Sequence, residues 1–443
     1  MKSKKVVFWS ASIALGGFLF GFDTAVISGA EQSIQKLWQL NDFQHGLAVA
    51  IALYGTVIGA LVGGLPADAF GRKPTLIFIA LFYMVSAIGS ALAPEVYSFM
   101  IFRFLGGIGV GASSVVAPIY ISELSPPSKR GRLVALFQLN IVLGIFLAYL
   151  SNYWIGGGGE QTWRWMLGVE TIPAFLFFVF ILGVPESPRW LIIKNNALEK
   201  AKKILDILDP DNTEETIASI LSLAPIVKKG KFSFILFSGK YSFIIMLAVL
   251  FAFFNQLSGI NAVVYYAPRI FELTGVSLDS ALLSTAGIGF INLIFTLVGM
   301  AIIDRFGRKI LMYFGSFGLI ITLGLISRAF TLEIFNAVPF LLFGYVAFFS
   351  LSQGAVIWVF ISEIFPTRVR AAGQSLGSFT HWLLAAIMTN AFPYFVNKVN
   401  GGPIFLVFFF IMILQLLFVW KLMPETRNVS LEELARKLES SSK

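Results

Sequence analysis

The residues of this chain that are best suited to chemistry are two charged side chains inside long apolar stretches. Asp23 lies in the stretch 6–28 and Arg103 in the stretch 97–121. A charge within a bilayer is costly and marks a functional site by default. At about 1.5 Å per helical residue, both lie roughly 8–9 Å below the outer ends of their stretches. Arg103 favours an ionised Asp23 and burial favours the neutral acid, so we expect a proton switch. A static ion pair is the alternative.

A second group of polar side chains suits a neutral ligand that is rich in hydroxyl groups. Amides both donate and accept hydrogen bonds, and a tryptophan offers a flat apolar face. Midway along several apolar stretches lie Gln138, Asn255, Gln256, Asn261, Asn292, Trp358, His381 and Trp382. A lone asparagine in a span usually bonds a neighbouring helix. So many polar groups near one depth indicate a binding cavity.

Membrane-spanning helices must position these side chains. Hydrophobic residues make up 57% of the 443 residues and charged residues 13%, against roughly 25% charged in a soluble domain. A span needs roughly 20 apolar residues. Twelve stretches qualify: 6–28, 46–66, 75–93, 97–121, 133–153, 166–184, 243–267, 280–303, 310–327, 339–362, 371–395 and 403–422. We therefore expect an all-α membrane protein with twelve transmembrane helices.

Positive charges predict the orientation of the spans. Lys and Arg collect in the tails and in every second loop, and the opposite loops hold only Lys36, Arg164, Arg269, Arg328 and Lys398. Because cytoplasmic loops are enriched in Lys and Arg, we expect a multi-pass protein of the cell (inner) membrane with both termini in the cytoplasm. The same pattern accounts for the net charge of +9 without a nucleic-acid partner.

Charged motifs in the first half of the chain recur in the second. The G-R-K of residues 71–73 returns at 307–309, Glu123 returns as Glu363, and P-E-S at 185–187 returns as P-E-T at 424–426. Such a repeat indicates a duplicated unit, which in a membrane protein most often moves a solute between its halves. We expect two pseudo-symmetric six-helix halves, 1–185 and 243–423. A cytoplasmic linker with short helices, 186–242, joins them, and a cytoplasmic tail, 424–443, follows.

These motifs also resemble those of a known family. They are G-x-x-x-D-x-x-G-R-K at 64–73, P-E-S-P-R-W at 185–190, Q-L-S-G-I-N at 256–261, D-R-F-G-R-K at 304–309 and P-E-T-R at 424–427. From the first span to the tail, the chain resembles the sugar porter family of the major facilitator superfamily, and within it the bacterial proton–xylose and proton–glucose symporters. The resemblance implies the major facilitator fold. It also implies import, by alternating access, of a proton and a monosaccharide, a hexose or pentose such as glucose or xylose.

The resemblance assigns roles to particular residues. Proton-coupled relatives are similar at Asp23 and Arg103, which favours symport. The family's sugar-contacting positions correspond to Gln138, Gln256, Asn261, Asn292, Trp358 and Trp382, and its outer gate to Tyr265 and Tyr266. Asn255 and His381 stand where the family usually has other polar residues, so the identity of the sugar stays open.

Charged residues where the spans meet the cytoplasm are expected to form a latch. Carboxylates facing guanidinium groups make charge-assisted hydrogen bonds, and a set joining both halves would hold the cytoplasmic side shut in one state. We expect Glu123 and Glu363 to pair with the arginines that follow them. The expected members are Asp68, Arg72, Glu123, Arg130, Arg132, Glu186, Arg189, Asp304, Arg308, Glu363, Arg368, Arg370 and Glu425. Solvated charges that only fix the topology are the alternative.

Other functions remain as alternatives at this point. A proton-independent facilitative uniporter is the alternative within transport, and a membrane sugar sensor is a less favoured one because the tail is short. The sequence has no cluster of metal ligands and no activated nucleophile, which argues against an enzyme. We expect no catalytic residue, metal or cofactor. We expect a monomer whose partners are the monosaccharide, the proton and the lipid bilayer.

Overall fold

The computed structural model describes residues 2–126, 129–156, 159–210, 212–227, 234–237, 239, 241–366, 369–399 and 401–427. Every regular element in these ranges is a helix, which confirms the all-α prediction. The predicted latch residue Arg368 and most of the tail lie outside the described residues.

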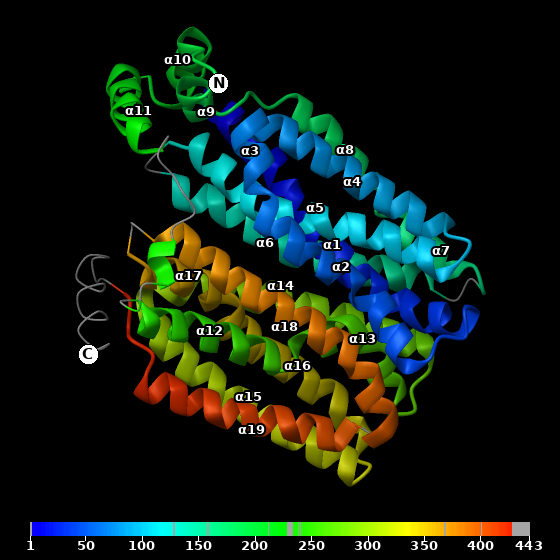
Figure 1. The fold of residues 1–443 in the computed structure, drawn as a ribbon. Coiled ribbons are helices and arrows are strands. Elements are labelled where there is room, and N and C mark those ends of the chain that lie inside the picture. The colour runs from blue at the N-terminus through cyan, green and yellow to red at the C-terminus, as the bar shows by residue number, and fades with distance from the viewer. Residues whose placement is uncertain are drawn as a thin grey trace. The chain divides into compact units, whose positions relative to one another are not determined.

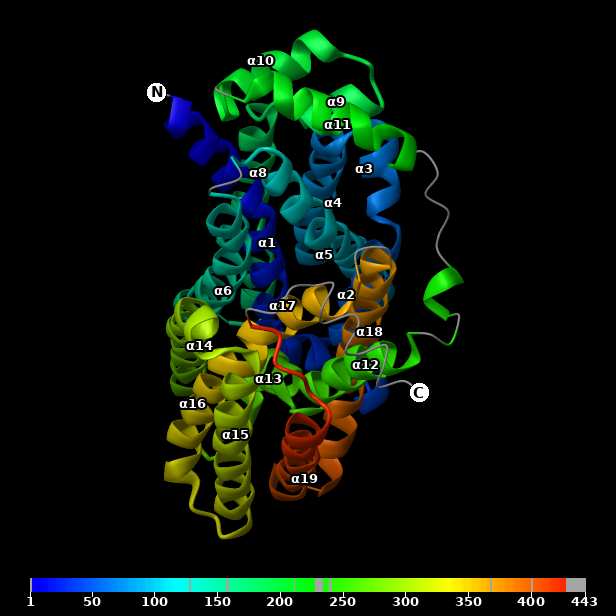
Figure 2. The same cartoon turned by 90° about the vertical axis from the view of Figure 1, so that its left-hand side faces the viewer.

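The helices up to the linker carry the first six predicted spans. They are α1 (Lys2–Leu37), α2 (Asp42–Val62), α3 (Gly64–Phe70), α4 (Arg72–Leu92), α5 (Val96–Glu123), α6 (Arg130–Ile155), α7 (Thr162–Gly168) and α8 (Thr171–Leu182). The linker contains α9 (Pro188–Ile193), α10 (Leu198–Leu208), α11 (Thr213–Val227) and the 3₁₀ turn η1 (Phe234–Phe237). Both ribbon views show α9, α10 and α11 lying together beyond the ends of α4 and α5 (Figures 1 and 2).

The remaining helices carry the last six spans. They are α12 (Ser242–Leu257), α13 (Ile260–Glu272), α14 (Leu278–Phe306), α15 (Arg308–Thr331), η2 (Phe335–Ala337), α16 (Val338–Phe349), the π-helical segment η3 (Ser350–Gly354), α17 (Ala355–Ile364), α18 (Arg370–Val399) and α19 (Gly401–Lys421). Several predicted spans therefore consist of two joined helices.

The twelve predicted spans are found as helical segments. In the described ranges, eleven segments are long and apolar enough to cross a membrane. The twelfth is α18, a helix of 30 residues that is less apolar because it carries polar side chains such as His381 and Asn390. The first span differs from its predicted end at residue 28, since α1 continues to Leu37. Polar residues such as Glu31 end the apolar pattern there without ending the helix.

The repeated G-R-K motif explains two helix boundaries. Gly71 has φ +107° and Gly307 has φ +91°, a left-handed region that glycine adopts at little cost. Each glycine ends one helix and begins the next, between α3 and α4 and between α14 and α15. The turn leaves the first backbone N–H groups of α4 and α15 without partners inside the helix, so a carboxylate can bind there.

The chain forms two compact units whose boundaries cross the sequence halves. Unit 1 comprises residues 1–23, 54–145 and 167–232, and unit 2 comprises 24–53, 146–166 and 233–443. In unit 1, α4 packs along α5, and in unit 2, α15 packs along α19 and α12 along α18. The C-terminal parts of α1 and α6 and the N-terminal part of α2 thus belong to the same unit as the C-terminal spans. The division into halves at 1–185 and 243–423 stays a prediction.

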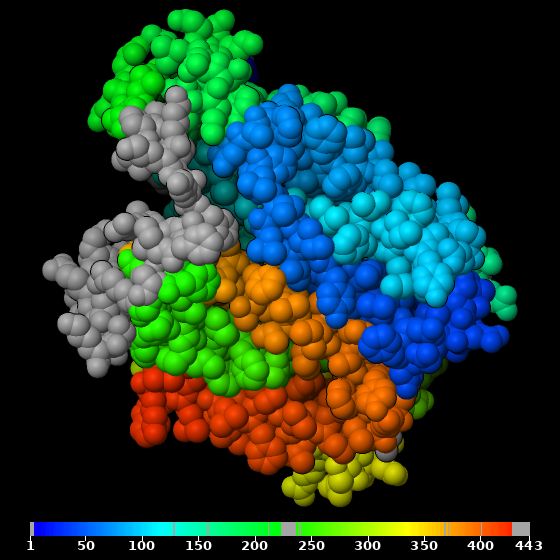
Figure 3. Space-filling view, in the orientation of Figure 1, coloured from blue at the N-terminus to red at the C-terminus, as the bar shows by residue number. Residues whose placement is uncertain are grey.

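Unit 2 exposes an apolar face along α19. Exposed side chains recur along this helix at Leu406, Val407, Phe410, Leu414, Leu417 and Trp420. In the space-filling view, α18 and α19 form a continuous orange and red surface (Figure 3). An exposed apolar face of this length is expected where a helix faces lipid.

Candidate functional site

The two charges found in the apolar spans form a buried ion pair in unit 1. Asp23 on α1 is 2% exposed and Arg103 on α5 is 1% exposed. The guanidinium Nη1 of Arg103 donates to Asp23 Oδ1, and its Nη2 donates to the Asp23 backbone oxygen at 3.1 Å. The structure thus brings together the two residues to which the sequence assigned matching depths.

A second carboxylate, Glu170, lies beside this pair. It immediately precedes α8, is 1% exposed, and interacts electrostatically with Asp23 and Arg103. Two neighbouring buried carboxylates repel each other when both are ionised, and a proton bound to either one removes that repulsion. Two carboxylates and one arginine are neutral together only when one proton is bound. The sequence analysis did not place Glu170 in the site, although it is a carboxylate inside the predicted span 166–184.

Close packing of α4 against α5 keeps this cluster buried. A Cβ atom at Gly106 on α5 would lie 2.3 Å from Ser86 Oγ on α4, so only glycine fits at this contact. Tyr83 on α4 is also fully buried. The electrostatic interactions are strong here because little water screens them.

The predicted sugar-binding residues of span 7 form a hydrogen-bonded amide cluster in unit 2. Gln256 Nε2 donates to Asn255 Oδ1 at 2.8 Å and lies 3.0 Å and 3.1 Å from the two ring nitrogens of His381. Asn261 Nδ2 donates to Gln256 Oε1. Gln256 is therefore at the centre of the cluster, with its donors and its acceptor all engaged.

Aromatic rings border the amide cluster. The His381 ring lies 4.8 Å from the Trp358 ring and 4.7 Å from the Trp382 ring, between centroids. His381 and Trp382 come from α18 and Trp358 from α17. The combination offers hydrogen-bonding groups and apolar ring faces side by side, as a sugar requires.

A break in span 7, which the sequence analysis did not predict, positions the cluster. Gly259 has φ +91° and separates α12 from α13. A Cβ atom there would lie 2.4 Å from the Phe408 ring, so both backbone and packing require glycine. The break places Asn255 and Gln256 in the last turn of α12 and Asn261 in the first turn of α13.

Asn292 and Gln138 do not share a described hydrogen bond with this cluster. Asn292 on α14 accepts hydrogen bonds from Ser350 at 2.8 Å and Thr296 at 3.3 Å. Gln138 is half-buried on α6, in unit 1. Their sugar contacts therefore stay predictions.

The π-helical segment in span 10 lies beside the cluster and was also missed. Asn255 Nδ2 donates to the backbone oxygen of Gln353 at 3.5 Å. The Gln353 side chain donates to Gln415 at 2.8 Å, and Gln415 donates to Ser316 at 2.8 Å. Single π-helical turns are frequent at functional sites. This one joins a second buried amide network to the first.

The predicted outer-gate tyrosines lie on α13 and are buried. Tyr265 is 1% and Tyr266 0% exposed. The Tyr266 hydroxyl donates to the Thr389 backbone oxygen at 2.9 Å, and its ring stacks on Phe392 at 5.1 Å. Both partners belong to α18, so Tyr266 ties α13 to α18.

The predicted latch residues of unit 1 pair differently from the expectation. Glu123 forms a bidentate pair with Arg72, at 3.0 Å and 3.2 Å, rather than with Arg130 or Arg132. Arg130 Nε instead donates to the Ser122 backbone oxygen at 3.1 Å, and Arg132 is exposed. Closeness in sequence suggested the wrong partner, because the turn at residue 71 brings Arg72 to the end of α5.

Glu186 caps the start of α4. Its carboxylate accepts the backbone N–H groups of Arg72 at 3.0 Å and Lys73 at 3.1 Å. Burial raises the pKa of this carboxyl, and the backbone hydrogen bonds and the Arg72 charge oppose that rise. Asp68 completes the group with a contact of 3.1 Å to Arg72 and is 67% exposed.

Unit 2 repeats this arrangement, as the duplicated motifs imply. Arg308 forms a bidentate pair with Glu363 at 3.1 Å and 2.8 Å. The Glu425 carboxylate accepts the backbone N–H groups of Arg308 and Lys309, both at 3.0 Å. Asp304 lies 3.0 Å from Arg308. Arg370, in contrast, donates to the Phe365 backbone oxygen at 3.3 Å.

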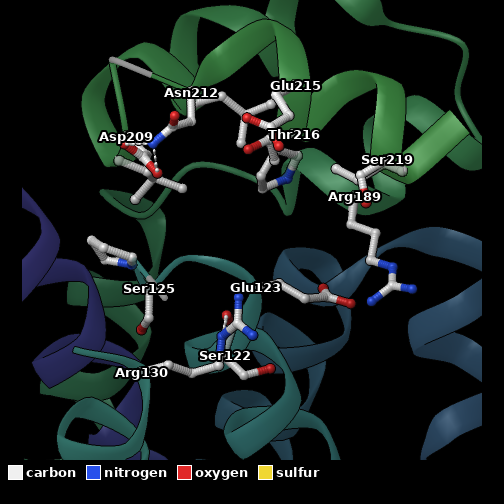
Figure 4. Close-up of a pocket in the computed structure, with 15 residues that line it drawn as sticks. Ser122, Glu123, Ser125, Arg130, Arg189, Asp209, Asn212, Glu215, Thr216 and Ser219 are labelled. Atoms are coloured by element: carbon white, nitrogen blue, oxygen red, sulfur yellow. Dashed lines mark hydrogen bonds between the residues drawn. The ribbon is translucent and has the colours of Figure 1, made fainter. Parts of the chain in front are cut away.

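A pocket of about 610 Å³ separates the linker helices from the C-terminal end of α5 in unit 1. Figure 4 shows Glu123 and Arg130 on one wall and the linker residues Asp209, Asn212 and Glu215 on the other. Arg189, the remaining predicted latch residue of this unit, is exposed and also lines the pocket. In the described part of the chain, no three acidic or histidine side chains gather as a metal site would require.

Comparison with known proteins identifies the family. Residues 9–438 match the family model described as "Sugar (and other) transporter". The chain belongs to this family. It is 38% identical to the glucose transport protein of Synechocystis sp., with 97% of both chains covered. It is 36% identical to the arabinose-proton symporter of Bacillus subtilis and 35% identical to the D-xylose-proton symporter of Escherichia coli. Those alignments cover 97% of this chain and 94% and 95% of the relatives.

Solved structures agree with this assignment. The partially occluded inward-open form of the E. coli xylose transporter XylE superposes with a TM-score of 0.85 at 33% identity, covering 96% of this chain and 99% of XylE. The XylE structure with bound 6-bromo-6-deoxy-D-glucose gives a TM-score of 0.80 at 33% identity, covering 99% and 100%. The fold is thus that of the major facilitator superfamily. As a member of a transporter family, the chain is not an enzyme.

Proposed function

We propose that the protein imports a monosaccharide together with a proton by alternating access. The substrate class is a hexose or pentose, since the relatives are named for glucose, xylose and arabinose. The protein works as a monomer in the cell (inner) membrane, with both termini in the cytoplasm. The sugar contacts the side chains of Gln256, Asn255, Asn261, His381, Trp358 and Trp382. Further contacts come from Asn292 and Gln138 when the transporter closes around the sugar.

The observation that carries proton coupling is the buried cluster of Asp23, Arg103 and Glu170. Its two buried carboxylates interact with each other and with one arginine, so the cluster gains or loses one proton at modest electrostatic cost. A facilitative uniporter has no need for two buried acids around one base. We therefore favour symport over uniport.

The test uses Asp23→Asn protein in proteoliposomes. The variant should lose uphill sugar accumulation under an imposed pH gradient and keep sugar exchange between equal pools. Glu95→Gln is the control, because Glu95 is an exposed carboxylate that caps α5 through Ser98. Accumulation that persists in Asp23→Asn would contradict coupling at this cluster. A competition panel of labelled pentoses and hexoses on the wild-type protein would identify the sugar.

A further inference from the structure

A second buried cluster of charged side chains lies in unit 2. Glu31 on α1 and His45 on α2 are both 0% exposed, and the side chain of Arg269 on α13 is 14% exposed. The sequence analysis placed all three in loops, because the predicted spans ended at residue 28, began at 46 and ended at 267. The structure gathers them around one carboxylate.

Glu31 is the shared acceptor of this cluster. Arg269 Nε donates to Glu31 Oε1 at 3.0 Å and Arg269 Nη2 to Oε2 at 2.8 Å. His45 Nε2 lies 2.7 Å from Glu31 Oε2, and Gln35 accepts from Arg269 Nη2 at 2.6 Å. A bidentate pair of this kind is strong and directional. Loss of either partner leaves an uncompensated buried charge, which favours any conformation that lets water reach it.

The cluster connects segments from the two halves of the sequence. The outer parts of α1 and α2 meet α13 through Glu31, and α2 meets α18 in a direct backbone contact. A Cβ atom at Gly46 would lie 2.0 Å from the Asn390 backbone oxygen. At the rim, Asn397 Nδ2 donates to Asp42 Oδ1 at 2.6 Å. These contacts hold the start of α2 against α18.

The outer-gate tyrosine packs directly on the cluster. The Tyr266 ring lies 6.0 Å from the His45 ring, edge to face, and its hydroxyl holds α18 through Thr389. Tyr266 also has non-helical backbone angles, so α13 bends at this residue, three positions before Arg269. Tyr266 and Arg269 therefore lie less than one helical turn apart, at and just after the bend.

We propose that Glu31, Arg269 and His45 form an outer latch, which holds the tyrosine gate shut while the transporter faces the cytoplasm. The proposal rests on transport by alternating access. The latch is the outer counterpart of the Arg72–Glu123 and Arg308–Glu363 pairs, but it joins α1 and α2 to α13 of the opposite sequence half. Arg269 and His45 are positioning residues that act through Glu31 on the gate.

The test is a cross-linking rate across the rim. The chain has no cysteine, so Asp42→Cys and Asn397→Cys introduce a single pair whose side chains touch in the closed gate. A short bifunctional thiol reagent should link this pair rapidly in the parent protein. Glu31→Gln and Arg269→Gln should each slow the linking about five-fold or more, and His45→Gln should slow it less. Arg164→Gln is the control, since that arginine lies in the same unit and bonds its near neighbour Gln161.

Two outcomes separate a latch from a purely structural cluster. Variants that unfold at a lower temperature but link at the parent rate would overturn the proposal. If the two main variants do not fold, Arg269→Lys keeps the charge and loses the bidentate geometry. Slower linking in Arg269→Lys would then support the latch, and a parent rate would overturn it. Because linking needs neither sugar nor proton, its failure is distinguishable from failure of the symport assay.

Discussion

Gln256 offers the sharpest test of the sugar site. Its amide makes hydrogen bonds with Asn255 and Asn261 and contacts His381. Gln256→Ala removes two donors and one acceptor from the centre of the cluster, so sugar hydroxyl groups would face an apolar side chain. An unsatisfied buried polar group costs about 1–3 kcal/mol. At about 1.4 kcal/mol for each factor of ten, the sugar should bind roughly 5- to 150-fold more weakly.

The assay is equilibrium binding of the labelled sugar to purified protein, with thermal unfolding as a check on folding. Gln415→Ala is a matched control, because Gln415 is an equally buried amide of the same unit that bonds Ser316 and Gln353. That change should lower the unfolding temperature and leave the affinity within a factor of two or so of wild type. Wild-type affinity in Gln256→Ala would refute the reasoning and move the site to other spans.

Three further predictions concern the ring face, the break in span 7 and the cytoplasmic pairs. Trp358→Ala should weaken sugar binding several-fold by removing an apolar surface, and unchanged binding would show that the ring is only packing. Gly259→Ala should lower the unfolding temperature more than Gly275→Ala does. Both residues have a positive φ, which costs alanine about 1–2 kcal/mol of backbone strain. A Cβ atom at Gly259 would also clash with the Phe408 ring, whereas one at Gly275 would meet no neighbouring atom. Glu123→Gln should raise the labelling of a cysteine introduced on the cytoplasmic side, whereas the exposed linker variant Glu199→Gln should not. Equal labelling of wild type and Glu123→Gln would mean that the Glu123–Arg72 pair only fixes the topology.

Patterns along the chain were sufficient to predict the spans and the repeated motifs. Apolar length predicts a span because a helix of about 20 residues crosses the hydrocarbon core. The same measure ended the first span at residue 28 and the seventh at residue 267, where polar groups begin, and so left Glu31 and Arg269 in loops. Hydropathy counts a buried ion pair as solvent-exposed charge. The partners that neutralise each other lie 238 residues apart, and only the fold brings them together.

The choice of partners was the second gap. Glu123 was assigned to the arginines that follow it, yet Arg72, 51 residues earlier, reaches it. A left-handed glycine turns the chain at the start of α4, and no count of charges anticipates where that turn aims a side chain. The break at Gly259 escaped for a similar reason, because apolar residues continue on both sides of it and the hydropathy shows no interruption.

The break at Gly259 divides span 7 into two helices that carry different functional residues. The first helix, α12, carries Gln256, and the second helix, α13, carries Tyr266 and Arg269. Asn261, at the start of α13, donates a hydrogen bond across the break to Gln256. A coupling free energy is equal in both directions. If the closed position of α13 increases the affinity for sugar, then bound sugar must favour that closed position by the same factor. A sugar analogue that contacts α12 but makes no contact with Asn261 would therefore bind without closing the gate. Such an analogue would act as an inhibitor.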